Sequence, residues 1–187
     1  MIGSIGAKAI DRRGAAVRSL RTLVAASAFG LTFVLIAGTA LASDISGTLS
    51  KTLTLTDDSQ LVGDVTCTVT GAPCITFGAS GISLKLNGFS ISGNADAITG
   101  CGGGGVGIEI GLDVNNQRGV VIEGPGTVQR FRGHGIRLFQ STRVLVRLVT
   151  VSTNCFAGMI VTAGSDNEIE ENIAVRNGSV NVPCGGI

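Results

Sequence analysis

Tryptophan and tyrosine are absent from this sequence of 187 residues, and histidine occurs once. The flat aromatic surfaces that commonly hold sugar rings are therefore limited to phenylalanine. With one histidine and no cysteine pair in C-x-x-C spacing, a zinc site is not expected. Proline is scarce, with three residues, and no long segment has the period of an amphipathic helix. These absences, together with abundant Gly, Val, Ile, Thr and Ser, predict an all-β protein of short strands and turns.

The first 42 residues differ from the rest of the chain. An uncharged run from Leu23 to Ala40 follows a group of arginines and precedes Leu41-Ala42-Ser43. A basic segment, an apolar segment and an A-x-A cleavage site in this order predict a signal peptide at residues 1–42, with its apolar part helical. An uncleaved N-terminal anchor is the alternative, because the run of 18 residues just suffices to span a bilayer. We therefore expect an exported protein that is periplasmic, on the cell surface or secreted, and that contacts the membrane only if the leader is retained.

Residues 43–187 carry nine basic and twelve acidic side chains, a formal net charge of −3. A mildly acidic chain has no overall attraction for polyanions. Nucleic acid is therefore not expected as a partner.

The same residues contain a repeat of 23 or 24 residues. Three kinds of strand-like segment recur with this spacing: one is centred on Ile122, Val146 and Ile169, and the second ends at Val128, Val151 and Val175. The third begins with Gly and an apolar residue, at 107–110, 135–138, 158–161 and 186–187. Three short strands per repeat predict a single-stranded parallel β-helix over 43–187, with three parallel sheets and about four turns.

The alternation within each segment predicts which side chains form the core. The residues expected inside are Leu84, Leu86, Ile122, Val128, Ile136, Leu138, Val144, Val146, Val151, Ile169 and Val175. On the outside, Glu123, Arg147 and Glu170 are expected at the same position of successive turns, where opposite charges attract. Asn154 and Asn177 suit tight turns, because asparagine tolerates the left-handed conformation, and their amides can pair between turns. One turn is longer than the others, which predicts a glycine-rich insertion near residues 99–105.

The five cysteines all follow the leader, where an exported chain can oxidise them. Cys155 and Cys184 precede the glycine of successive third strands, so we expect them within disulfide reach. Cys67 and Cys74 flank a short turn and form a second candidate pair, which leaves Cys101 over. The alternative is that all five are reduced and buried.

The chain resembles the right-handed parallel β-helix proteins of the pectin-lyase-like superfamily over roughly residues 50–187. The resemblance rests on Leu53-Thr54-Leu55-Thr56-Asp57-Asp58, on the stretch from Cys67 to Phe77, on Leu84-Lys85-Leu86-Asn87-Gly88-Phe89-Ser90-Ile91-Ser92-Gly93 and on the repeated Gly-x-Gly-Ile. It implies a right-handed coil and an exported or surface protein. It does not by itself imply an activity, because one fold carries many functions.

Two motifs of enzymes in that superfamily have partial counterparts here. His134 lies in a Gly-His-Gly like that of polygalacturonases, but the aspartates that such enzymes use as acid and base have no match, so a structural role is favoured. The arginines around it are similar to the proton-abstracting bases of polysaccharide lyases, which also need acidic residues for calcium. We expect them instead to pair with acidic neighbours, Arg137 with Glu109 and Arg147 with Glu123. The side chains left as carbohydrate-facing candidates are Arg130, Arg132, His134 and Arg137.

The sequence ends just inside a third strand, without the cap that a stack of turns requires. We expect a β-helix truncated at its C-terminal end, or one whose last turn is covered by self-association. The predicted function is a structural or surface-binding role, with extracellular or cell-wall polysaccharide as the candidate ligand. No catalytic, cofactor-binding or metal-binding residue is assigned. The alternative is an incomplete polysaccharide lyase or glycoside hydrolase, and only this alternative calls for calcium.

Overall fold

The computed structural model describes residues 42–95, 101 and 109–178. Within these residues every regular element is a β-strand, and no helix is long and apolar enough to cross a membrane. The predicted leader, most of the glycine-rich segment, Cys184 and the last strand-like segment at 186–187 lie outside them. The strands are β1 (Ser43–Leu49), β2 (Leu53–Leu55), β3 (Ser59–Cys67), β4 (Ile75–Phe77), β5 (Ser83–Lys85), β6 (Ser90–Ser92), β7 (Leu112–Asn115), β8 (Val121–Gln129), β9 (Ile136–Phe139), β10 (Leu145–Ser152), β11 (Met159–Thr162), β12 (Glu168–Glu170) and β13 (Ile173–Val175).

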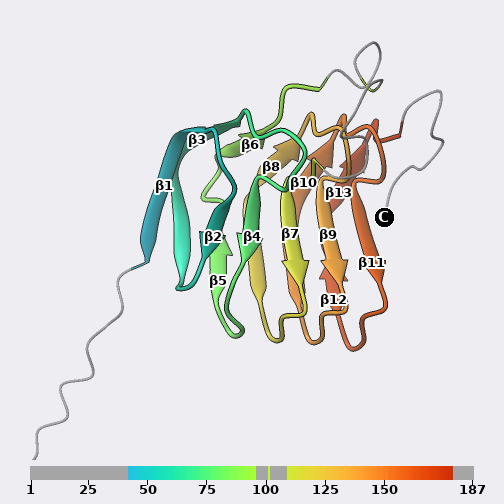
Figure 1. Ribbon diagram of the computed structural model, residues 1–187. Coiled ribbons are helices and arrows are strands. Elements are labelled where there is room, and N and C mark those ends of the chain that lie inside the picture. The colour runs from blue at the N-terminus through green and yellow to red at the C-terminus, as the bar shows by residue number, and fades with distance from the viewer. Residues whose placement is uncertain (1–41, 96–100, 102–108, 179–187) are drawn as a thin grey trace, which may run out of the picture. The chain divides into compact units, whose positions relative to one another are not determined.

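The strands form two parallel sheets (Figure 1). The first has the order β1-β3-β5-β8-β10-β12, with β6 paired to β3 and β8 and with β13 paired to β10. The second has the order β2-β4-β7-β9-β11. Later strands pair with the strand one repeat further on, as when Val121 pairs with Leu145 and Leu145 with Glu168. The chain therefore coils, and each repeat lies beside the next, as in the parallel β-helix class.

The number of sheets differs from the prediction of three. Strands β3, β8 and β10 run continuously through the first two predicted strand types, so that both types belong to one sheet. The register of β8 and β10 shifts between Arg147 and Val149, which marks the boundary between the two types. The second sheet has five strands, one more than the four turns expected, because β2 and β4 extend the repeat toward the N-terminus.

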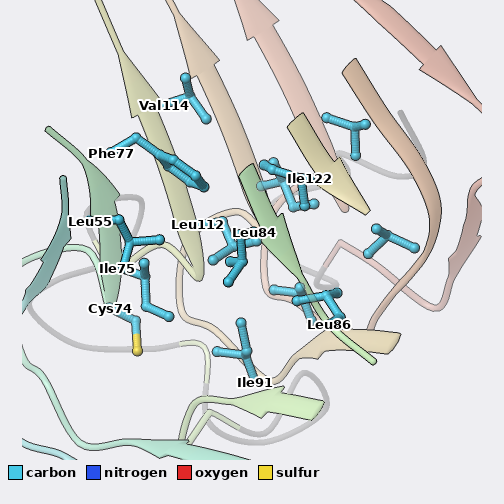
Figure 2. Packing of buried hydrophobic residues seen from close by; sticks show 14 of the residues in the cluster. Leu55, Cys74, Ile75, Phe77, Leu84, Leu86, Ile91, Leu112, Val114 and Ile122 are labelled. Carbon is cyan, nitrogen blue, oxygen red and sulfur yellow. The ribbon is translucent and has the colours of Figure 1, made fainter. Parts of the chain in front are cut away.

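Apolar side chains from both sheets form one core between them (Figure 2). Leu84, Ile122 and Val146 occupy the same position of successive turns and are all fully buried. Burying one such side chain contributes roughly 1.5–3 kcal/mol, so that stacked columns of this kind are the main stabilising element of the coil. The predicted core residues are buried, with two exceptions in the last described repeat.

The exceptions are Val175 and Ile169. Val151 pairs with Ala174, so that Val175 pairs with Ser152 and is 41 % exposed. The prediction of an inward Val175 is wrong because the turn before β13 is one residue shorter than spacing alone suggested. Ile169 has the predicted register, opposite Val146, but is only half-buried.

Single residues in the left-handed conformation turn the chain at its corners. One series is Arg130, Thr153 and Arg176, with φ of 61°, 52° and 54°, each 23 residues after the last. Another is Leu148 and Glu171, with φ of 58° and 53°. Asparagine was expected in this role, but Thr153 and Arg176 hold it and Asn154 and Asn177 come immediately after. The predicted amide pairing is confirmed, because Asn154 and Asn177 are hydrogen-bonded to each other.

Candidate functional site

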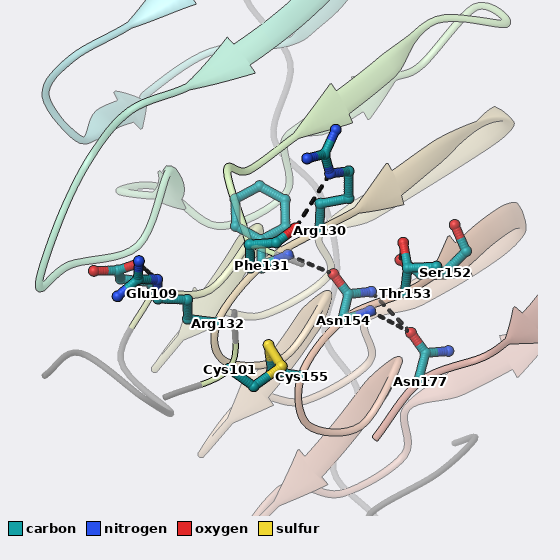
Figure 3. The surroundings of a disulfide bond; sticks show 11 residues. Cys101, Glu109, Arg130, Phe131, Arg132, Ser152, Thr153, Asn154, Cys155 and Asn177 are labelled. Carbon is teal, nitrogen blue, oxygen red and sulfur yellow. Dashed lines mark hydrogen bonds and ion pairs between the residues drawn. A yellow bond between two sulfur atoms is a disulfide. The ribbon is translucent and has the colours of Figure 1, made fainter. Parts of the chain in front are cut away.

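The carbohydrate-facing candidates lie between the end of β8 and the middle of β9. Arg130 is at a left-handed corner and donates from Nε to the carbonyl of Ala95 at 3.2 Å. Arg132 turns the other way, and its Nε lies 3.7 Å from Oε2 of Glu109, a side chain only 7 % exposed (Figure 3). The two guanidinium groups are therefore held by different parts of the preceding turn.

Arg137 forms a bidentate ion pair with Asp113. Its Nε and Nη2 each donate to a carboxylate oxygen of Asp113 at 2.8 Å, and its guanidinium lies 5.7 Å from the ring centroid of Phe139. Bidentate pairing of this kind is strong and directional. The hydrogen bonds to Asp113 raise the pKa of Arg137 above its ordinary value. Arg137 is consequently a fixed cation.

The prediction that Arg137 pairs with Glu109 is wrong. The Gly-x-Gly-Ile frame at 105–108 suggested a strand there, but the third strand of this turn is β7, and Leu112 pairs with Ile136. Asp113 is thus opposite Arg137, whereas Glu109 precedes the strand and meets Arg132. The insertion extends further along the chain than the glycine run, so that the repeat resumes at Gly111.

His134 lies two residues before the start of β9 and packs against Phe156, with the ring centroids 5.4 Å apart. Its Nδ1 is buried and has no hydrogen-bond partner. Burial lowers the pKa of His134, and the positive charge of Arg137 lowers it further, against a hydrogen bond with the main chain of Ala157 that raises it. The histidine is therefore largely neutral at neutral pH. No carboxylate is hydrogen-bonded to it in the described part of the chain.

The charged column on the first sheet has the predicted register. Arg147 pairs with Glu123 on one side and with Glu170 on the other. Its Nη2 contacts Oε1 of Glu123 in an ion pair. The basic Lys85 lies on the far side of Glu123, so that charges alternate along the column.

Two disulfides are present among the described residues. Cys67 is bonded to Cys74, as predicted, with their Cα atoms 6.0 Å apart. Cys155 is bonded to Cys101, not to Cys184, with a Cα separation of 5.6 Å (Figure 3). Cys101 thus lies at the corner beside Asn154, next to Cys155. Cys184 is outside the described residues.

Acidic groups do not gather into a site in the described ranges. No set of three or more His, Cys, Asp or Glu side chains there is arranged to hold a metal ion. Glu109, Asp113 and Glu123 each face a different arginine. The arrangement can fix the turns against one another, because each of these three carboxylates is paired with a guanidinium group.

A groove of about 500 Å³ lies on the first sheet, and no motif in the sequence indicates it. It follows the corner between the two strand types of the first sheet, and we call it the corner groove. Its lining residues are Gly88, Pro125, Gly126, Thr127, Leu148, Val149, Thr150, Glu171 and Ile173. The only signal in the sequence is that outward residues such as Thr127 and Thr150 repeat with the period of the turns. The repeat shows that these residues form one surface only when the register of the strands is known.

Comparison of the chain with protein-family models, with curated proteins and with solved structures finds no match. The site therefore has to be interpreted from its own geometry.

Proposed function

We propose that the protein is an exported β-helix with a structural or surface-binding role, and that its coil is the single-stranded, right-handed helix of the pectin-lyase-like superfamily. The observation that carries this proposal is the pairing of the arginines. Arg132, Arg137 and Arg147 each face a carboxylate on the preceding turn, at Glu109, Asp113 and Glu123. A lyase needs an arginine that is free to approach a substrate carboxylate. Here the carboxylate is supplied by the protein itself.

The burial of the partners strengthens the argument. The side chains of Glu109 and Asp113 are 7 % and 5 % exposed, so that their charges depend on the arginines that cover them. Withdrawing either arginine toward a ligand leaves a buried charge unpaired, which costs several kcal/mol. Arg132 and Arg137 therefore hold the turns together in preference to binding an acidic sugar.

Export is supported by the cysteine chemistry. The Cys67–Cys74 and Cys101–Cys155 disulfides fit an oxidising compartment, such as the periplasm or the outside of the cell. Extracellular or cell-wall polysaccharide is the proposed partner. Self-association through the last turn is a further proposal, and its test is the molecular mass in solution.

An assay of purified protein on uronate polysaccharides, with and without calcium, tests the function. We expect no release of unsaturated or reducing products, and intact protein before and after incubation. Release of products that is lost in the Arg137→Lys or Arg147→Lys variant contradicts the proposal and favours the lyase or hydrolase alternative. Lysine retains the charge in both variants, which limits the effect of the substitution on folding.

A further inference from the structure

We propose that the corner groove binds a neutral polysaccharide chain, which lies along the direction in which the turns stack. This inference rests on the proposed surface-binding function and specifies where the ligand binds and which class of ligand it is. It moves the site from the arginines that the sequence suggested to a surface on the first sheet that carries no basic residue.

The length of the groove suits an extended polymer. Gly88, Pro125, Leu148 and Glu171 lie at the corner on four successive turns. Turns of a parallel sheet are about 4.8 Å apart, so that the groove extends over roughly 14 Å along the stack. A compact small molecule would occupy only part of this length, whereas a chain of a few linked sugars fills it.

The lining combines apolar surface with free hydroxyl groups. Leu148 and Ile173 are 44 % and 57 % exposed, which is unusual for large apolar side chains. With Pro125 they offer aliphatic surface to the C–H faces of sugar rings, a role that aromatic side chains fill in other proteins.

Thr127 and Thr150 both line the groove, one turn apart. Neither hydroxyl has a hydrogen-bond partner in the described part of the chain, so both are available to a ligand. The neighbouring column differs in this respect. There Gln129 donates to the hydroxyl of Ser92 at 3.0 Å and accepts from that of Ser152 at 3.5 Å, so that these groups satisfy one another.

The charge of the groove selects against acidic polysaccharides. Glu171 is the only ionisable residue in the lining, and no ion pair involves it within the described ranges. Its carboxylate can accept hydrogen bonds from sugar hydroxyls but repels a uronate. Because of this repulsion, a neutral polysaccharide should bind the groove more tightly than an acidic, pectin-like one.

The main chains of neighbouring turns approach each other closely below the groove. A Cβ added at Gly124 would meet the carbonyl oxygen of Leu148 at 1.8 Å, and one at Gly126 would meet Cβ of Leu86 at 2.3 Å. These glycines let neighbouring turns approach closely at the corner.

Isothermal titration with neutral hexasaccharides of β-linked glucose, xylose and mannose tests the inference, with hexagalacturonate as the acidic comparison. We expect at least one neutral sugar to bind, and more tightly than hexagalacturonate. Thr150→Val removes a hydroxyl at nearly constant volume, and Leu148→Asn removes the apolar wall while retaining a residue that tolerates the left-handed corner. Each variant should weaken binding about tenfold, the effect of roughly 1.4 kcal/mol.

Val62→Asn is the matched control, because Val62 is 47 % exposed and does not line the groove. Its affinity should equal that of the unsubstituted protein, and denaturation curves show that all variants are folded. Binding that is unchanged in Thr150→Val and Leu148→Asn overturns the corner groove as the site. So does the absence of binding to every neutral sugar, or a preference for hexagalacturonate. None of these results involves product release, so failure of this inference and failure of the proposed function are distinguishable.

Discussion

The carboxamide oxygen of Asn177 accepts two hydrogen bonds from Asn154, one from its main-chain N–H at 3.1 Å and one from its side-chain Nδ2 at 3.0 Å. Asn154 repeats the arrangement one turn earlier, accepting from the N–H of Phe131 (Figure 3). Its Nδ2 also donates to the carbonyl of Val128. Asn167 and Asn172 do the same at other corners, accepting from Val144 and Val149. Asparagine side chains thus supply the hydrogen bonds that the main chain lacks where it turns.

Replacing Asn154 with alanine should destabilise the protein by about 3 kcal/mol. Asn154 is fully buried, and its loss leaves the N–H of Phe131 without its partner and removes the hydrogen bond to the carbonyl of Val128. Each unsatisfied buried group costs roughly 1–3 kcal/mol. The free energy of unfolding in urea measures the effect. Asn115→Ala is the control, because its side chain accepts only from Asn116, and it should change stability by less than about 0.5 kcal/mol. Equal effects of the two substitutions would contradict this interpretation.

Replacing Leu148 with glycine should stabilise the protein by about 1 kcal/mol. Leu148 has φ of 58°, a conformation that costs a side-chain-bearing residue roughly 1–2 kcal/mol relative to glycine. It is 44 % exposed, so that less burial is lost than at a core position. The midpoint of thermal unfolding checks this. Val161→Gly, at an equally exposed strand position, should lower the midpoint, and a decrease for Leu148→Gly as well would show that packing of Leu148 outweighs its strain.

The sequence predicts the strands best where the repeat is regular. From β8 to β13 the turns have nearly constant length, so that the register of Glu123, Arg147 and Glu170 follows from spacing alone. The sequence predicts the strand register poorly where two alignments of the repeat fit equally well. Gly107-Ile108 and Gly111-Leu112 both match the third strand, and Ala174 and Val175 are both apolar. Pairing with the neighbouring turn decides between them, and this information is not local.

The candidate site shows the same limit. The acidic neighbours of the arginines were predictable as a class, and Arg147 was matched correctly with Glu123. The partner of Arg137 depended on where the insertion ends. The position of the corner groove could not be predicted, because it follows from the register of four turns and from the bend between two strand types. No sequence motif indicates either of these.

Replacing Arg137 with methionine should destabilise the protein by about 3 kcal/mol, because Asp113 then remains as a buried unpaired carboxylate. The double variant Arg137→Met with Asp113→Leu should recover most of that loss. Arg147→Met is the comparison, since the Arg147 side chain is 40 % exposed and its pair with Glu123 should contribute less than about 1 kcal/mol. Urea denaturation of the four proteins gives the differences. A double variant as unstable as Arg137→Met alone would show that packing of the arginine stem, not the pairing of charge, is what matters.

The stability of the protein should fall in acid partly through His134. Its pKa in the folded protein lies below the ordinary value of 6.5, because burial and the charge of Arg137 disfavour the imidazolium. The unfolded chain therefore binds more protons between these two pKa values, and stability rises with pH in that range. The contribution is fully present above pH 6.5 and is lost as the pH falls through the folded pKa. His134→Phe removes this titration while keeping an aromatic contact with Phe156. The loss of unfolding free energy from about pH 8 to about pH 5 should be smaller in this variant than in the unsubstituted protein, because other titrations are common to both. If both proteins lose the same amount, the imidazole is equally well solvated in the folded and unfolded states, and the burial of Nδ1 does not disfavour its protonation.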